Sequence, residues 1–292
     1  MPRSGQTRDA LPASGHGGSS TIRPLSPGSG GLSARDITTP GGVRIAYESI
    51  GDDERGVPML LIQGLGAPML GWRREFCEAL AAQGFRVIRF DNRDCGLSQK
   101  FPEGHYLLAD MADDVIGLLD ALNIDQAHIV GQSLGGMIAQ ELILRRPDKA
   151  ASLCLIYTTP STTHILNERD HSAIATQPRA RSRQEAIEQY LQNESFAASR
   201  AYEFDTAWIR TLGGLIWDHC YYPEGIPRQL RAAFRSPERT AALGTVTAPT
   251  LIIHGDADRL IDVSASHVLA QALPHATLRI FAGLGHELPP PL

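Results

Sequence analysis

The pentapeptide Gly131-Gln-Ser-Leu-Gly135, of the form G-x-S-x-G, is the strongest chemical signal in the sequence. It lies between an apolar stretch, 128–130, that is typical of a strand and a helical pattern that begins near Leu134. Small residues two positions before and after the serine let a strand turn sharply into a helix, and the turn exposes the serine hydroxyl beside the free N–H groups of the helix. The pattern therefore predicts that Ser133 is a nucleophile.

A serine nucleophile needs a base at neutral pH, and the base needs an acid that orients it. In proteins with this kind of turn, the acid and then the histidine follow the serine along the chain. One predicted strand runs directly into His254-Gly-Asp-Ala-Asp258, and the last predicted strand runs into Ala282-Gly-Leu-Gly-His286. Both loops follow the carboxyl ends of strands, at the edge where the serine is expected. We therefore predict His286 as the base and either Asp256 or Asp258 as the acid.

Acyl transfer also needs N–H donors for the oxyanion, and we expect two from the backbone. The first is the N–H of Leu134, directly after the nucleophile, and the second is that of Leu65, in the glycine-rich loop that follows the apolar strand 58–62. The same loop lacks the third glycine of a dinucleotide fingerprint, because Met69 stands at that position. The segment 254–258 has no further ligand at metal spacing. The sequence thus predicts no cofactor and no metal.

The elements that must position these residues alternate along the chain from about residue 37 onward. We expect strands at 43–47, 58–62, 86–90, 128–130, 151–156, 250–253 and 277–281, and helices at 72–83, 110–122, 134–145 and 263–273. This alternation predicts an α/β fold, a mostly parallel twisted sheet with helices on both faces.

The alternation is interrupted between two of the predicted strands. Residues 159–246 show only helical patterns, at 184–191, 201–212 and 228–234, and they are too many for a loop in a compact domain. We expect them to form a helical cap over one edge of the sheet, on a core made of 34–158 and 247–292. Residues 1–33 are rich in Gly, Ser and Pro and are predicted to be a disordered tail.

The composition excludes several classes of partner. The net charge is −5, without the basic excess of a nucleic-acid-binding surface. No apolar run approaches the roughly 18 residues of a membrane span, and no signal peptide is apparent. The four cysteines are far apart and match no zinc or disulfide spacing, which favours reduced thiols and a cytoplasmic protein. The oligomeric state is not indicated.

Two further groups of residues each have two interpretations. The segment Asp91-Asn-Arg-Asp-Cys-Gly-Leu-Ser98 follows a strand at the functional edge, where its charged groups are expected to brace a loop rather than to react, and Cys95 is expected to be structural. Aromatic residues of the cap either line a pocket for a sizeable apolar acyl or alcohol group or simply hold the cap helices together; they are Trp208, Trp217, Tyr221 and Tyr222.

Taken together, these segments resemble the α/β-hydrolase family. The loop 91–98 is similar to its D-x-R-x-x-G-x-S segment, the loop 254–258 to its H-G-x-x-D acid loop, and the loop 283–286 to its G-x-G-H segment. The resemblance implies the capped sheet, and it selects Asp258 as the acid. Three features are similar to the aclacinomycin methylesterase subgroup: Gly71-Trp72, the Arg-Asp pair in the loop 91–98, and the segment 274–288. This similarity implies cleavage of small carboxylic esters, such as methyl esters, on bulky substrates.

The sequence departs from the family pattern at two places. Gln63 replaces the histidine that is common before the oxyanion loop, although a backbone donor does not depend on that side chain. The sequence stops six residues after His286, where the family has a further helix, and Pro289-Pro-Pro291 excludes a helix. We therefore expect apolar sheet surface to remain uncovered and the His286 loop to be poorly held.

These observations predict a cofactor-independent serine hydrolase that cleaves a carboxylic ester of moderate to large apolar size through an acyl-enzyme. Two alternatives stay open. The same three side chains could act on an amide, a lactone, a carbon–carbon bond or a peroxide, or the chain could be an inactive, ligand-binding relative.

Overall fold

A single mixed sheet forms the centre of the molecule, as the sequence predicts. The computed structural model describes residues 21–22, 34–166 and 176–289, and within them the strand order is β1-β2-β3-β5-β4-β6-β7-β8-β9. Pairs from β5 through β9 are parallel, whereas β1, β2 and β3 are joined antiparallel at one edge. The strands are β1 Thr21–Ile22, β2 Arg35–Thr38, β3 Arg44–Ile50, β4 Val57–Ile62, β5 Phe85–Phe90, β6 Ala127–Gln132, β7 Ala150–Ile156, β8 Thr250–Gly255 and β9 Ala276–Phe281.

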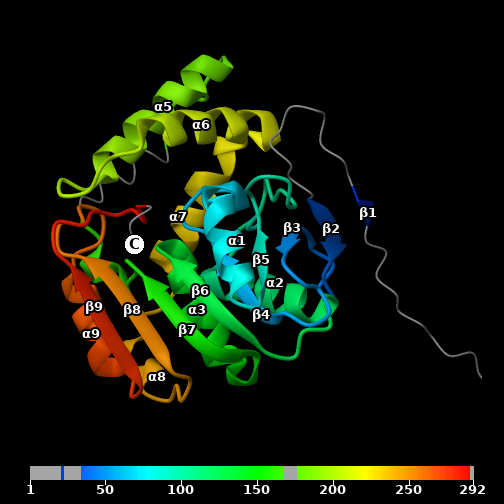
Figure 1. Cartoon of the computed structure of the whole chain (residues 1–292), viewed down its shortest axis with the longest axis vertical. Coiled ribbons are helices and arrows are strands. Elements are labelled where there is room, and N and C mark those ends of the chain that lie inside the picture. Colours follow the sequence, from blue (N-terminus) through cyan, green and yellow to red (C-terminus); the bar gives the residue numbers. More distant parts are fainter. Residues whose placement is uncertain (1–20, 23–33, 167–175, 290–292) are drawn as a thin grey trace, which may run out of the picture.

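Helices lie on both faces of this sheet and above its edge (Figure 1). The α-helices are α1 Arg74–Ala82, α2 Leu108–Ala121, α3 Leu134–Arg145, α5 Arg183–Ala197, α6 Thr206–Cys220, α7 Ile226–Arg235, α8 Thr240–Leu243 and α9 Ser264–Ala272. Short 3-10 turns occur at η1 Met69–Gly71, η2 Pro147–Lys149, η3 Thr162–His164 and η4 Pro223–Gly225. The predicted α/β class is therefore confirmed.

Strand β4 shows why the central strands are continuously apolar. Leu60 and Ile62 belong to the core that includes residues of α2, α3 and α9, whereas Leu61, between them, belongs to the core that contains residues of α1. All three side chains are completely buried. Side chains alternate across a strand, so a strand covered on both faces needs an apolar residue at every position.

The cap helices α5, α6 and α7 lie in the chain between β7 and β8, where the sequence indicates helices without strands. Ser182 caps α5 through the N–H of Glu185, and Asp205 caps α6 through the N–H of Trp208. Figure 1 shows α5 and α6 lying together on one side of the sheet, apart from the helices on its faces. The boundaries 34–158, 159–246 and 247–292 stay predictions.

Both ends of the described chain differ from ordinary core elements. The predicted tail, 1–33, lies outside the described residues except for Thr21–Ile22, which pair with Arg35 and Asp36 of β2. After β9, residues 282–289 contain no helix, and Leu251 of β8 keeps 37% of its surface exposed.

None of the helices in the described ranges is long and apolar enough to cross a membrane.

We predict that Gly135→Ala will destabilise the fold. A Cβ atom at Gly135 would lie 2.2 Å from the carbonyl oxygen of Ile62, which is backbone of a central strand and has no room to move. The free energy of unfolding, measured by urea denaturation, should fall by ~2–3 kcal/mol. Gly41→Ala is the control, because a Cβ there meets only Thr39 Oγ1 at 3.7 Å. An unchanged denaturation midpoint for Gly135→Ala would contradict the close packing of this turn.

Candidate active site

Ser133 stands at the turn from β6 into α3, with backbone angles φ 53° and ψ −122°. The turn is tight, since a Cβ at Gly131 would lie 2.4 Å from the carbonyl oxygen of Gly135. The N–H of Ser133 donates to Ile156 O at 2.9 Å, and the Thr158 hydroxyl donates to Ser133 O at 2.6 Å. These bonds hold a left-handed backbone that is costly for a residue with a side chain, and such strain is typical of functional sites.

Asp258 and His286 are brought into direct contact from the loops after β8 and β9. His286 Nδ1 lies 2.7 Å from Asp258 Oδ2, while the other carboxylate oxygen accepts the N–H groups of Leu260 and Ile261 at 2.8 and 3.0 Å. Burial alone would raise the pKa of Asp258, but the two facing histidines and these N–H groups hold that pKa well below its usual range. Asp258 is therefore a stable anion next to an imidazole.

The other candidate acid has a different role. Asp256 Oδ1 accepts the N–H of Gly283 at 2.6 Å and so ties the loop after β8 to the loop after β9. The geometry thus agrees with the choice of Asp258 that the family resemblance makes.

A second imidazole on the carboxylate of Asp258 was missed from the sequence. His254 Nε2 lies 3.1 Å from Asp258 Oδ2, and its Nδ1 lies 2.6 Å from Ser266 Oγ. The signal was present, because His254 begins the H-G-x-x-D segment. Across the described ranges, no group of three or more His, Cys, Asp and Glu side chains is arranged to hold a metal ion.

Ser133 and His286 line the same cavity but are not hydrogen-bonded to each other within the described structure. The His286 ring packs against Tyr157, with ring centroids 4.4 Å apart. Tyr157 also donates to Gln132 Oε1 at 2.6 Å. In proteins without a bound substrate, a nucleophile and its base are often separated by more than hydrogen-bond distance and approach on binding.

The loop 63–66, which we expect to supply an oxyanion donor, packs against Ser133. A Cβ at Gly64 would lie 3.8 Å from Ser133 Oγ. Gln63 does the positioning in place of the usual histidine: its Oε1 accepts the N–H of Gly64 at 3.1 Å, and its carbonyl accepts from Asn92 Nδ2 at 3.2 Å. The N–H groups of Leu65 and Leu134 donate to no acceptor in the described part of the protein.

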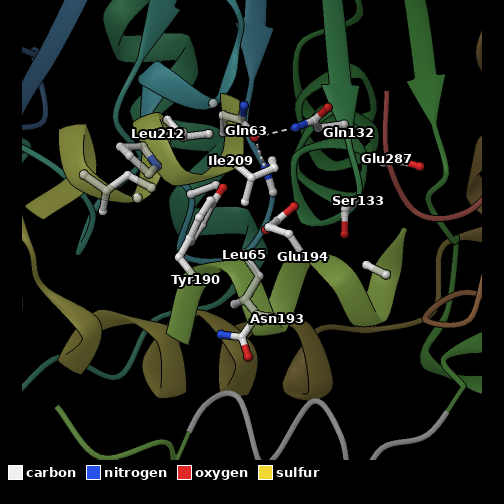
Figure 2. Close-up of a pocket in the computed structure, with 18 of the residues that line it drawn as sticks. Gln63, Leu65, Gln132, Ser133, Tyr190, Asn193, Glu194, Ile209, Leu212 and Glu287 are labelled. Atoms are coloured by element: carbon white, nitrogen blue, oxygen red, sulfur yellow. Dashed lines mark hydrogen bonds between the residues drawn. The ribbon is translucent and has the colours of Figure 1, made fainter. Parts of the chain in front are cut away.

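A cavity of about 610 Å³ lies between the sheet edge and the cap. Figure 2 shows Ser133 facing side chains of α5 and α6, including Tyr190, Glu194 and Ile209. Of the aromatic cap residues singled out in the sequence, Trp208, Tyr221 and Tyr222 line the cavity. Trp217 is absent from its described lining and packs on Tyr221, with centroids 5.0 Å apart.

The charged loop 91–98 fastens the cap to the core, as its predicted bracing role requires. Asp91 Oδ2 lies 3.0 Å from Nε2 of His219 on α6, and Asp94 pairs with Arg228 on α7 at 2.8 Å. Burial opposes the charge on Asp91, but His219 and the N–H groups of Leu97 and Met69 hold its pKa below the ordinary value. The two buried carboxylates of this loop, Asp91 and Asp94, thus have their charged or polar partners in the cap.

The loop that carries His286 is held by the cap, which corrects the expectation that it is poorly held. The N–H of His286 donates to Ala197 O, the last residue of α5, at 2.9 Å. Ser199 Oγ accepts the N–H of Gly285 at 2.8 Å, and the N–H of Ser199 donates to Glu287 Oε1 at 2.6 Å. The cap segment after α5 therefore supports this loop, although no helix follows it among the described residues.

We predict that Ser199→Ala will loosen the His286 loop. The substitution removes the acceptor for Gly285 N–H, a loss of ~1 kcal/mol locally, so hydrogen–deuterium exchange of a peptide covering 283–288 should accelerate about fivefold. Ser195→Ala is the matched control, because the Ser195 hydroxyl bonds only within α5, to Leu191 O. Equal exchange in the two variants would show that the bond does not hold the loop.

Comparisons with known proteins identify the fold family. The pattern of the alpha/beta hydrolase fold family matches residues 57–289. A putative carbamate hydrolase, RutD of Variovorax paradoxus (strain S110), is 32% identical over 79% of this chain and 85% of its own. Rhodomycin D methylesterase DauP of Streptomyces sp. (strain C5) is 29% identical over 85% and 90%. A solved structure is also similar, that of a meta-cleavage product hydrolase of Pseudomonas fluorescens IP01, CumD, in a mutant form complexed with acetates. It aligns with a TM-score of 0.69 and 25% identity, over 86% of this chain and 90% of its own. The chain belongs to the α/β-hydrolase fold family, and it is a hydrolase of that fold.

Proposed function

We propose that this protein is a cofactor-independent serine hydrolase that cleaves a carboxylic ester, such as a methyl ester, through an acyl-enzyme. The observation that carries the proposal is the 2.7 Å hydrogen bond from Asp258 to His286, which lines the same cavity as Ser133. An anion that fixes one nitrogen of an imidazole leaves the other nitrogen free to take a proton from a hydroxyl.

The proposed reaction has two halves. His286 Nε2 takes the proton of Ser133 Oγ as the oxygen attacks the ester carbonyl, and the N–H groups of Leu65 and Leu134 stabilise the oxyanion. The carbon–oxygen bond to the alcohol then breaks, and the alcohol leaves with the proton from His286. Water attacks the acyl-enzyme in the same way, giving its proton to His286, which returns it to Ser133 Oγ as the acid is released.

One of the relatives supports an ester as the substrate class. DauP, which is named as a methylesterase, aligns with 85% of this chain. The names of RutD and CumD point instead to a carbamate and to a meta-cleavage product. A panel of an aryl ester, a methyl ester, a carbamate and a meta-cleavage product distinguishes these substrate classes. The highest kcat/KM on an ester is the outcome we expect.

Ser133→Ala should abolish both ester turnover and labelling by a fluorophosphonate probe. The loss of the hydroxyl removes the atom that forms the acyl-enzyme, so kcat should fall by ~10³-fold or more. Intact-mass spectrometry of the wild type after the probe should show one adduct, mapped by peptide sequencing to Ser133. Turnover that survives in Ser133→Ala would assign the nucleophile elsewhere, and a wild type that neither turns over esters nor takes the probe would favour a ligand-binding relative.

Asp258→Asn should lower kcat by ~10³–10⁴-fold, because an amide neither fixes the productive tautomer of His286 nor stabilises its cation. Asp256→Asn is the matched control two residues away, since its oxygen still accepts from Gly283 N–H and faces no catalytic group. Steady-state kinetics on the same ester measure both. A larger loss for Asp256→Asn than for Asp258→Asn would exchange the roles of the two carboxylates.

A further inference from the structure

The lining of the cavity carries an excess of negative charge that the proposed ester chemistry does not use. Arg73 is the only Lys or Arg side chain among the described lining residues, and it is already paired with Asp205 at 3.0 Å. Five carboxylates line the same space: Glu75, Glu194, Glu203, Asp205 and Glu287. A substrate with a free carboxylate would be repelled from this cavity, and a cation would be attracted.

Glu194 is one of these five carboxylates, and its side chain is part-buried. It lies on the inner face of α5, one helical turn before the carbonyl of Ala197 that binds His286 N–H, and Figure 2 shows it reaching toward the part of the cavity that holds Ser133. The Tyr190 side chain acts on it and lowers the pKa of its carboxyl. No Lys or Arg of the described residues forms an ion pair with Glu194.

The groups that face Glu194 come from every element around it. Tyr190 belongs to its own helix, His286 and Glu287 follow β9, and Tyr157 follows β7. The residues that α6 contributes to the cavity lining carry no charge: Trp208, Ile209, Leu212, Gly213 and Ile216. Burial raises the pKa of the Glu194 carboxyl to about 7, and Glu287 adds to the rise, although His286 and Tyr190 oppose it. The cavity therefore contains a carboxyl group that has no Lys or Arg partner among the described residues.

We propose that the ester substrate of this cavity carries a cationic amino or quaternary ammonium group, and that Glu194 is the residue that binds it while the ester carbonyl lies at Ser133. The inference rests on the proposed esterase function and adds the class of substrate to it.

The aromatic lining fits the same kind of group. Tyrosine and tryptophan rings attract a cation over their faces, most strongly where water is excluded. The cavity is lined by Trp72, Phe76, Tyr157, Tyr190, Phe204, Trp208, Tyr221 and Tyr222. An ammonium group between Glu194 and such rings would have its charge balanced by the carboxylate. Its methylene or methyl groups would be in contact with apolar surface.

A matched pair of substrates tests the proposal. The p-nitrophenyl ester of 4-(trimethylammonio)butanoate has a permanent charge, and the p-nitrophenyl ester of 5,5-dimethylhexanoate has the same shape without it. At about pH 8 the wild type should favour the cationic ester by at least tenfold in kcat/KM, mostly through KM. Glu194→Gln should remove this preference and keep turnover of the neutral ester. Glu103→Gln, which removes one exposed carboxylate outside the cavity lining, should retain the preference.

The pH dependence of the preference provides a test that needs no variant. An ionisation that affects the turnover of both esters equally cancels in the ratio of their kcat/KM values. Glu194 binds a cation only when ionised, so the ratio should rise between roughly pH 6 and pH 8 in the wild type and stay flat in Glu194→Gln.

The outcomes separate this inference from the function on which it rests. Equal kcat/KM for the two esters in the wild type, or a preference that Glu194→Gln retains, overturns the cation site while hydrolysis that depends on Ser133 stands. Hydrolysis of both esters by Ser133→Ala overturns the esterase proposal itself. If Glu194→Gln does not fold, a ratio that is flat with pH in the wild type is enough to reject the role of Glu194.

Discussion

The carboxylate of Asp258 is the constraint on which the arrangement of the site depends. One of its oxygens is taken by two backbone N–H groups of its own loop, and the other faces His254 and His286. A buried anion with fewer donors would take up a proton or leave the interior, because desolvation of a charge is costly unless each oxygen is satisfied. His254, anchored on Ser266 of α9, thus fixes Asp258, and Asp258 in turn fixes the ring of His286. The orientation of the His286 ring, the proposed base, thus depends on contacts among the loops after β8 and β9 and α9.

The cap helices do more than cover the cavity, because they also make polar contacts with the core and with the His286 loop. Its helices meet the core through buried polar contacts: His219 with Asp91, Arg228 with Asp94, and Gln229 with the carbonyl of Arg93 at 2.7 Å. A separate contact, from Ala197 to His286, ties the end of α5 to the catalytic loop. A displacement of α5 would therefore move two parts of the site at the same time, the cavity wall and the loop that carries His286. One helix, α5, thus both lines the cavity and contacts the loop of His286.

The parts of the fold and the site that could be predicted from the sequence are those governed by short-range pattern. Continuous apolar strands, the 3.6-residue period of α2 and the glycine spacing around Ser133 all follow from local sterics, and the helix expected over 134–145 has these bounds in the structure. The short strand β2, second from the edge of the sheet, was missed because its four residues have neither an apolar run nor clear alternation. Contacts between distant segments were also missed. Nothing in the sequence near Ser199 or Glu194 indicates that the turn after α5 meets the His286 loop, since that proximity depends on how the cap is placed.

The acidic side chains that line the cavity would affect the charges that form on His286 and on the ester oxygen during the proposed reaction. Asp258 is hydrogen-bonded to His286, and in the proposed reaction this anion stabilises the imidazolium that forms when His286 takes a proton. The acidic side chains of the cavity lining would oppose the oxyanion that forms at the same moment, so the proposed N–H donors, Leu65 and Leu134, would act against an unfavourable field. Protonation of Glu194, or a cation bound beside it, relieves that opposition. An acidic cavity in a serine hydrolase is therefore consistent with catalysis when the substrate itself supplies the compensating positive charge.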